Sequence, residues 1–83
     1  MYMKSNKLNK YYWGVLIPVV KEGLKDVGYN GLSDRDVHEF LVKRFEVDYS
    51  ELSNIEFIEY KENIQQWASE FLNIYMPDPN EIL

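Results

Sequence analysis

The sequence contains no cysteine and no long hydrophobic run. The absence of cysteine excludes disulfides, thiolate chemistry and zinc ribbons, so packing must hold the fold, and we expect a cytoplasmic setting. The longest uncharged stretch, YYWGVLIPVV at residues 11–20, is about half as long as the ~20 residues that cross a bilayer. The polar, basic start MYMKSNKLNK is not followed by a signal-type cleavage site. We therefore expect no membrane contact.

The residues that carry most catalysis are also scarce. The four glycines form no phosphate-binding loop, and the single histidine, His38, has no obvious serine partner. The many carboxylates lie on predicted polar helix faces or in a link, where nothing suggests a pocket that would separate the pKa values of two of them. The sequence therefore predicts no enzymatic activity, no cofactor and no small-molecule substrate.

One pair of residues has the spacing of metal ligands. Asp34 and His38 stand four residues apart, on one face of a predicted helix. However, the chain has only one histidine, and Asp34 and Asp36 are also expected to favour a helix amino terminus. We therefore expect a solvated first turn rather than a metal site.

What the chain does have is apolar and aromatic content. Its 83 residues suffice for one small domain, residues 1–83, and 46% hydrophobic with 16% aromatic residues argues against disorder. The net charge of −5 argues against a protein that coats nucleic acid. The charge is uneven, because residues 1–25 carry five lysines against Glu22. This basic end is compatible with a phosphate contact and equally with a solvated helix end.

Apolar periodicity predicts two helices in the second half of the chain. Residues 54–73 follow a capping box of Ser53 and Glu56, and residues 34–45 follow a Ser33 cap with Asp36 at the third position. The apolar positions recur every three or four residues. In residues 54–73 they are Phe57, Tyr60, Ile64, Trp67, Phe71 and Ile74. In residues 34–45 they are Val37, Phe40, Leu41 and Phe45. In the link between the helices, Tyr49 or Leu52 is expected to turn inward.

The β-branched residues of YYWGVLIPVV would also suit a strand, but two helical stripes pass through it. These stripes are Leu8, Tyr12, Val15 and Val19, and Trp13, Leu16, Ile17, Val20, Leu24 and Val27. They predict a helix over residues 6–27 that ends at Gly28 and bends where the Pro18 ring meets the carbonyl of Gly14. Residues 74–83 contain two prolines and are expected to form an extended tail anchored by Ile74 and Met76. The predicted fold class is therefore all-α, with three helices.

The segment KLNKYYW interleaves lysines with aromatic rings, as single-strand binders do. Tyr12 and Trp13 lie on the predicted apolar stripes, so we expect them to be buried and Tyr11 to be exposed. The candidate nucleic-acid-binding residues are therefore Lys4, Lys7, Lys10 and Tyr11.

Three stretches together resemble a pattern in phage proteins of the NinB/Orf recombination type. They are KSNKLNKYYWGVLIPVV, DVHEFLVKRF and LSNIEFIEYKENIQQWASEFLNIYMPDPNE. The order and spacing match along nearly the whole chain, although the family's proteins carry a further amino-terminal portion with strands. The resemblance implies a role in phage recombination, contact with single-stranded DNA or the host single-strand-binding protein, and a dimeric state.

The sequence leaves two functional interpretations open. The chain is either a phage- or prophage-derived accessory protein of recombination or replication that contacts single-stranded DNA or its binding protein, or a non-enzymatic protein-interaction or dimerisation module. Both apolar stripes of residues 6–27, together with Trp67 and Phe71, exceed what three short helices can cover. This surplus motivates a prediction of homodimerisation through the aromatic faces.

Overall fold

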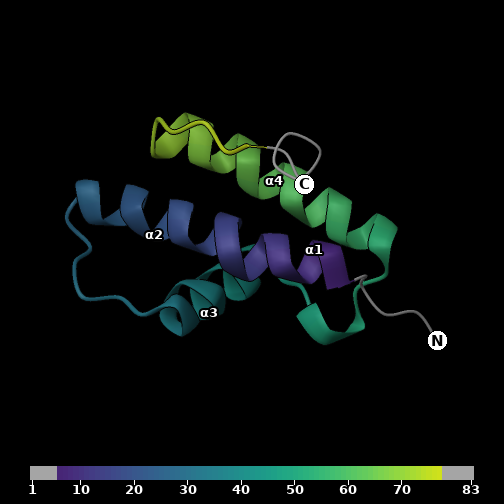
Figure 1. The fold of residues 1–83 in the computed structure, drawn as a ribbon. Helices are drawn as coiled ribbons and strands as arrows, with labels where there is room; N and C mark the ends of the chain where they lie inside the picture. Colours follow the sequence, from purple (N-terminus) through teal and green to yellow (C-terminus); the bar gives the residue numbers. More distant parts are fainter. Residues whose placement is uncertain (1–5, 78–83) are drawn as a thin grey trace.

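The computed structural model describes residues 6–77, which form three helical rods joined by short links (Figure 1). The first rod consists of α1 (Asn6–Tyr11), the π-helical turn η1 (Tyr12–Leu16) and α2 (Ile17–Asp26). The other two rods are α3 (Asp34–Phe45) and α4 (Asn54–Phe71), with the short 3-10 helix η2 (Tyr49–Glu51) between them. No strand occurs within the described residues, and the predicted all-α fold is confirmed.

Local capping sets the starts of α3 and α4, as the sequence predicts. The Ser33 hydroxyl accepts from the Asp36 amide at 3.1 Å, and the Ser53 hydroxyl accepts from the Glu56 amide at 3.2 Å. In return, the Asp36 carboxylate accepts from the Ser33 amide and the Glu56 carboxylate accepts from the Ser53 amide, which completes two capping boxes. α4 ends at Phe71 rather than residue 73, because Asn73 takes a left-handed conformation with φ 56°.

At the position of the predicted bend, the first rod contains a π turn. The amide of Ile17 bonds to the carbonyl of Tyr12, five residues back, just before Pro18, which has no amide hydrogen to donate. This turn accommodates proline without breaking the rod. Each residue of an α-helix turns the chain by about 100°, so the extra residue of a π turn rotates the preceding helix about its axis relative to the next one.

That rotation corrects two predictions made from a uniform helical period. Tyr11, expected on the surface, is 1% exposed, whereas Trp13, expected in the core, is 36% exposed. A continuous 3.6-residue period places Trp13 on the buried face of the rod, with Leu16 and Ile17. The wider π turn brings Tyr11 towards this buried face and leaves Trp13 near the surface.

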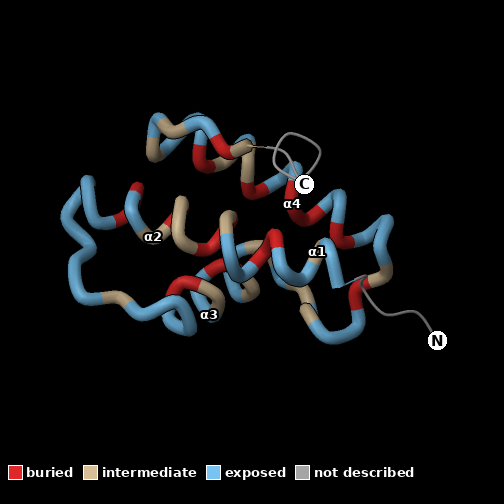
Figure 2. Tube along the Cα trace, viewed as in Figure 1, coloured by how far each residue is buried: buried red, intermediate tan, exposed pale blue. Residues whose placement is uncertain are grey.

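The core lies between the three rods, and buried positions line their inward sides (Figure 2). Its largest fully buried side chains are Tyr11, Tyr12, Phe57, Leu16, Ile17, Leu41, Ile64, Val20 and Val37. In the link Leu52 is buried and Tyr49 is half-buried, so both turn inward. Met76 of the tail is 4% exposed, and the Tyr11 hydroxyl donates to the Pro77 carbonyl at 2.7 Å. Residues 78–83 of the predicted tail lie outside the described residues.

Several predicted core positions lie on the surface instead. Phe71 is 65%, Val27 51% and Phe40 41% exposed, while Trp67 and Phe45 are half-buried. The first three side chains line one hollow. The ends of α2 and α4 and the start of α3 lie at the same end of the molecule (Figure 1). The described elements cover these three only in part.

Candidate functional site

The basic amino-terminal end does not present the predicted set of residues. Lys7 and Lys10 are exposed, Tyr11 is buried, and Lys4 lies outside the described residues. The exposed ring beside the lysines is Trp13, which lines a hollow of about 250 Å³ together with Lys10, Asn6 and Asn9. The predicted exposure of Tyr11 and burial of Trp13 were wrong because the apolar pattern does not reveal the π turn.

Tyr12 is the centre of a buried hydroxyl network. Its oxygen lies 2.7 Å from His38 Nδ1 and 3.0 Å from the Tyr60 hydroxyl. Burial raises the pKa of Tyr12 far above its ordinary value and raises the pKa of Tyr60 to about 12. The phenols are therefore neutral at physiological pH. A neutral His38 that carries its proton on Nε2 accepts from Tyr12, which in turn accepts from Tyr60.

This network links the first rod, α3 and α4 through Tyr12, His38 and Tyr60. Burial lowers the pKa of His38, an effect that Glu39 opposes and Arg35 reinforces. The imidazole also packs on two neighbouring rings, with centroids 4.9 Å from Trp13 and 5.2 Å from Tyr49. Beside these rings, His38 also lines a hollow with Val42, Val47, Asp48, Tyr49 and Ser50. The Ser50 hydroxyl donates to Asp48 Oδ1 at 2.9 Å, and the hydrogen bond of His38 among the described residues goes to Tyr12.

The candidate metal ligands are engaged separately. Asp34 Oδ1 lies 3.3 Å from Lys21 Nζ, whereas His38 Nδ1 faces Tyr12. Within residues 6–77 no group of three or more histidine or acidic side chains is arranged to hold a metal ion. In the same range no helix combines the length and apolarity needed to cross a membrane.

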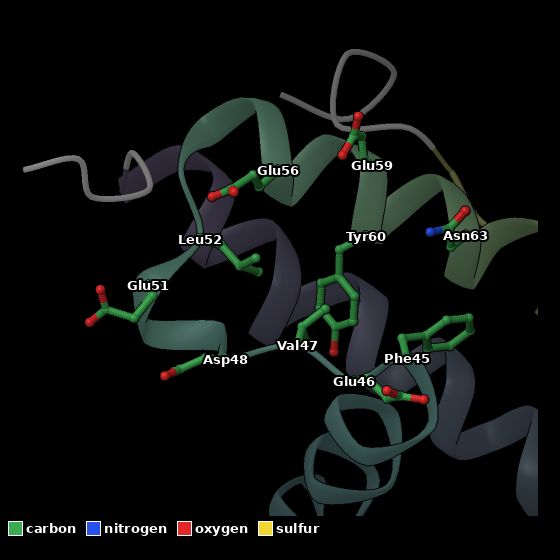
Figure 3. A pocket seen from close by; sticks show the side chains of 10 residues that line it. All are labelled: Phe45, Glu46, Val47, Asp48, Glu51, Leu52, Glu56, Glu59, Tyr60 and Asn63. Atoms are coloured by element: carbon green, nitrogen blue, oxygen red, sulfur yellow. The ribbon is translucent and has the colours of Figure 1, made fainter.

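A hollow of about 390 Å³ beside the α3–α4 link has an acidic rim (Figure 3). Its floor is formed by Leu52, Tyr60 and their apolar neighbours, and the carboxylates stand around the edge and do not converge on one point (Figure 3). Two of them already accept local hydrogen bonds, Glu56 from the Ser53 amide at 2.9 Å and Asp48 from the Ser50 hydroxyl at 2.9 Å. The arrangement therefore lacks the convergent pair that acid–base chemistry requires.

A hollow of about 410 Å³ has a mostly apolar lining, and we call it the apolar groove. It opens between the end of α2, the following turn, the start of α3 and the end of α4. Its lining residues are Leu24, Val27, Tyr29, Leu32, Asp36, Phe40, Trp67, Phe71 and Leu72. Asp36 is the only ionisable acid or base among them, apart from the Tyr29 phenol.

Aromatic rings build the α3 and α4 walls of the apolar groove. Phe40 and Trp67 approach each other across the two helices at 5.6 Å between centroids, and Trp67 and Phe71 follow along α4 at 6.5 Å. Tyr29, in the turn after α2, is 62% exposed. The apolar surplus predicted from the sequence includes Val27, Trp67 and Phe71 but neither Tyr29 nor Phe40, which was expected in the core.

Comparison with models of protein families, with curated proteins and with solved structures finds no match for this chain. The resemblance to NinB/Orf proteins therefore stays a prediction, and the functional proposals rest on the geometry alone.

Proposed function

We propose that this chain is a non-enzymatic protein-interaction or dimerisation module whose partner docks in the apolar groove. The observation that carries the proposal is the exposure of three large rings at one hollow. At about 150–250 Å² for each aromatic side chain, the exposed parts of Tyr29, Phe40 and Phe71 amount to roughly 250–400 Å². An apolar patch of about 300–600 Å² is the largest on a typical monomer and is often functional.

The energetic argument is that this area is costly to leave in water. At about 25 cal/mol per Å² of buried apolar surface, covering the three rings would contribute roughly 6–10 kcal/mol before the entropic costs of association are subtracted. The same lining contains a single carboxylate, so little polar surface would have to be desolvated. A protein surface with bulky apolar side chains fits these properties.

The test is specific co-purification of a protein partner from the native cell. We expect the partner, or a second copy of the chain, to be captured by the wild type and lost with Phe71→Ser. Capture should survive Ile55→Ser, which changes an equally apolar side chain that is 73% exposed but lies outside the apolar groove. Capture should also survive the double change Lys7→Glu and Lys10→Glu. Equal capture by all variants would contradict the proposal.

A second candidate function rests on the hollow beside Trp13. In this alternative the chain is a phage- or prophage-derived accessory protein of recombination or replication that contacts single-stranded DNA or its binding protein. The supporting observation is that Trp13, not Tyr11, exposes a ring next to Lys10, with Lys7 exposed on the same helix. Rings that stack on bases and ammonium groups that contact phosphates are the features of single-strand binding sites.

Titration with a single-stranded oligonucleotide at low salt tests this candidate. We expect binding that weakens with salt, with Trp13→Ala and with charge reversal of Lys7 and Lys10 (and of Lys4), and that withstands Lys43→Glu on α3. Lys43 is an exposed lysine remote in sequence from that hollow, and it serves as the matched control. No binding at low salt would count against this candidate and leave the interaction module in place.

A further inference from the structure

The apolar groove has the form of an empty helix position in a helical bundle. α3 begins at the end of the molecule where α2 and α4 finish, and Phe40 of α3 meets Trp67 of α4 there. The apolar stripe of α4 is buried at Tyr60 and Ile64, half-buried at Trp67 and 65% exposed at Phe71. α3 and α4 therefore form two walls of the hollow, and the end of α2 with the turn that carries Tyr29 flanks it.

We propose that the occupant of this position is one amphipathic helix of a partner protein, with basic side chains beside its apolar face. This inference rests on the proposed interaction function and specifies the partner. Helix-in-groove recognition uses bulky apolar side chains at positions i, i+3 or i+4, and i+7. The apolar groove offers matching contacts at Phe40, Trp67 and Phe71, which line one hollow from two helices.

The exposed area favours a single helix over a second copy of the whole chain. A stable protein dimer takes about 800 Å² from each partner. The three exposed rings supply roughly 250–400 Å², about half of that amount or less. One face of a short helix needs less surface than a dimer interface, and it can reach into the hollow between α3 and α4.

Charge favours a basic occupant. The chain has a net charge of −5, and the one carboxylate in the lining, Asp36, is exposed. Its hydrogen bonds to Ser33 lower the pKa of Asp36, so this carboxylate remains ionised. A second copy would bring the same net charge and another Asp36 to the interface, whereas lysine or arginine beside the apolar face would meet an opposite charge.

Calorimetric titration of the full chain with model helices tests the inference. The probe is a peptide of about 18 residues made of leucine and lysine, with the leucines on one helical face. Two control peptides are used. One has the same composition with leucine and lysine alternating, and the other keeps the leucine face and replaces lysine by glutamate.

We expect micromolar binding of the leucine–lysine helix and binding at least about tenfold weaker for either control peptide. Phe71→Ser and Tyr29→Ser should each weaken binding of the helix about tenfold, while Ile55→Ser should change it by less than about twofold. The three substituted side chains are all more than 60% exposed, so none of the changes should unfold the chain.

Two results would overturn the inference. If the alternating peptide binds as well as the helix, or if Phe71→Ser and Ile55→Ser behave alike, the interaction is merely electrostatic. If the wild type sediments as a dimer that Phe71→Ser dissociates, the occupant is a second copy of the chain. The second result overturns the inference but supports the proposed function, which fails only if protein capture is indifferent to the apolar groove.

Discussion

At the scale of single residues, Tyr12 has the most consequential polar group in the core. It is 0% exposed, and its hydroxyl links His38 of α3 with Tyr60 of α4. Removing the oxygen with Tyr12→Phe leaves both partners without this bond in a buried setting. We expect a loss of about 1–3 kcal/mol in the free energy of unfolding, measured by urea denaturation. Tyr49→Phe, which removes an exposed bond to Asn9 Oδ1, is the control and should cost less. Equal losses would contradict the assigned role of Tyr12.

His38 also makes the stability of the protein depend on pH. Burial lowers the pKa of His38 in the folded chain below the value of about 6.5 that it has when unfolded. In the interval between these two pKa values the unfolded chain binds the proton and the folded chain does not, so protonation favours unfolding. The urea midpoint should therefore fall as the pH is lowered from about 7.5 to about 5.5. His38→Gln should flatten this dependence, and an unchanged slope would assign the effect to other groups.

At the scale of elements, local signals determined what could be predicted. The starts of α3 and α4 were predictable because each begins with a capping box between a serine, Ser33 or Ser53, and the acidic residue three positions later. The rotation of the first rod was not predictable, because Pro18 indicates a local disturbance of the helix but not that a π turn accommodates it. The candidate site at the basic end was misjudged for the same reason. The apolar groove was only partly predictable, since periodicity identifies an apolar face but not which part of it a neighbouring helix covers.

Two glycines of the first rod provide an element-scale test, because the same substitution should act differently at each. A Cβ on Gly14 would meet nothing within 4 Å, so Gly14→Ala should gain about 0.5–1 kcal/mol from helix propensity. A Cβ on Gly23 would lie 3.0 Å from Ile74 Cδ1 and 3.2 Å from Leu72 Cδ1, side chains that follow α4. We expect Gly23→Ala to forfeit the gain and to show a stability at or below that of the wild type. Urea denaturation of the two variants measures the difference, and equal gains would show that α2 is not in close contact with this segment.

At the scale of the whole molecule, the chain divides its large apolar side chains between a core and an exposed groove. Phe57 and Phe71 lie on the same helix, but Phe57 is 0% and Phe71 is 65% exposed. A domain of 83 residues has a total stability of roughly 4–12 kcal/mol, so one core ring accounts for a large share of it. A groove ring contributes little to folding, so its free energy of burial remains available for binding a partner.

This division predicts opposite behaviour for matched substitutions on α4. Phe57→Ala should cost about 3–5 kcal/mol and bring the chain close to unfolding, so the milder Ile64→Val, at about 0.5–1.5 kcal/mol, tests the core in a chain that stays folded. Phe71→Ser should change the free energy of unfolding by no more than about 0.5 kcal/mol, because the ring is mostly solvated before and after unfolding. The same Phe71→Ser change should lower the fluorescence of an apolar dye bound to the native protein, whereas Ile64→Val should leave it unaltered. A large loss of stability with Phe71→Ser would mean that this ring belongs to the core, and the apolar groove would then lose its role as a docking surface.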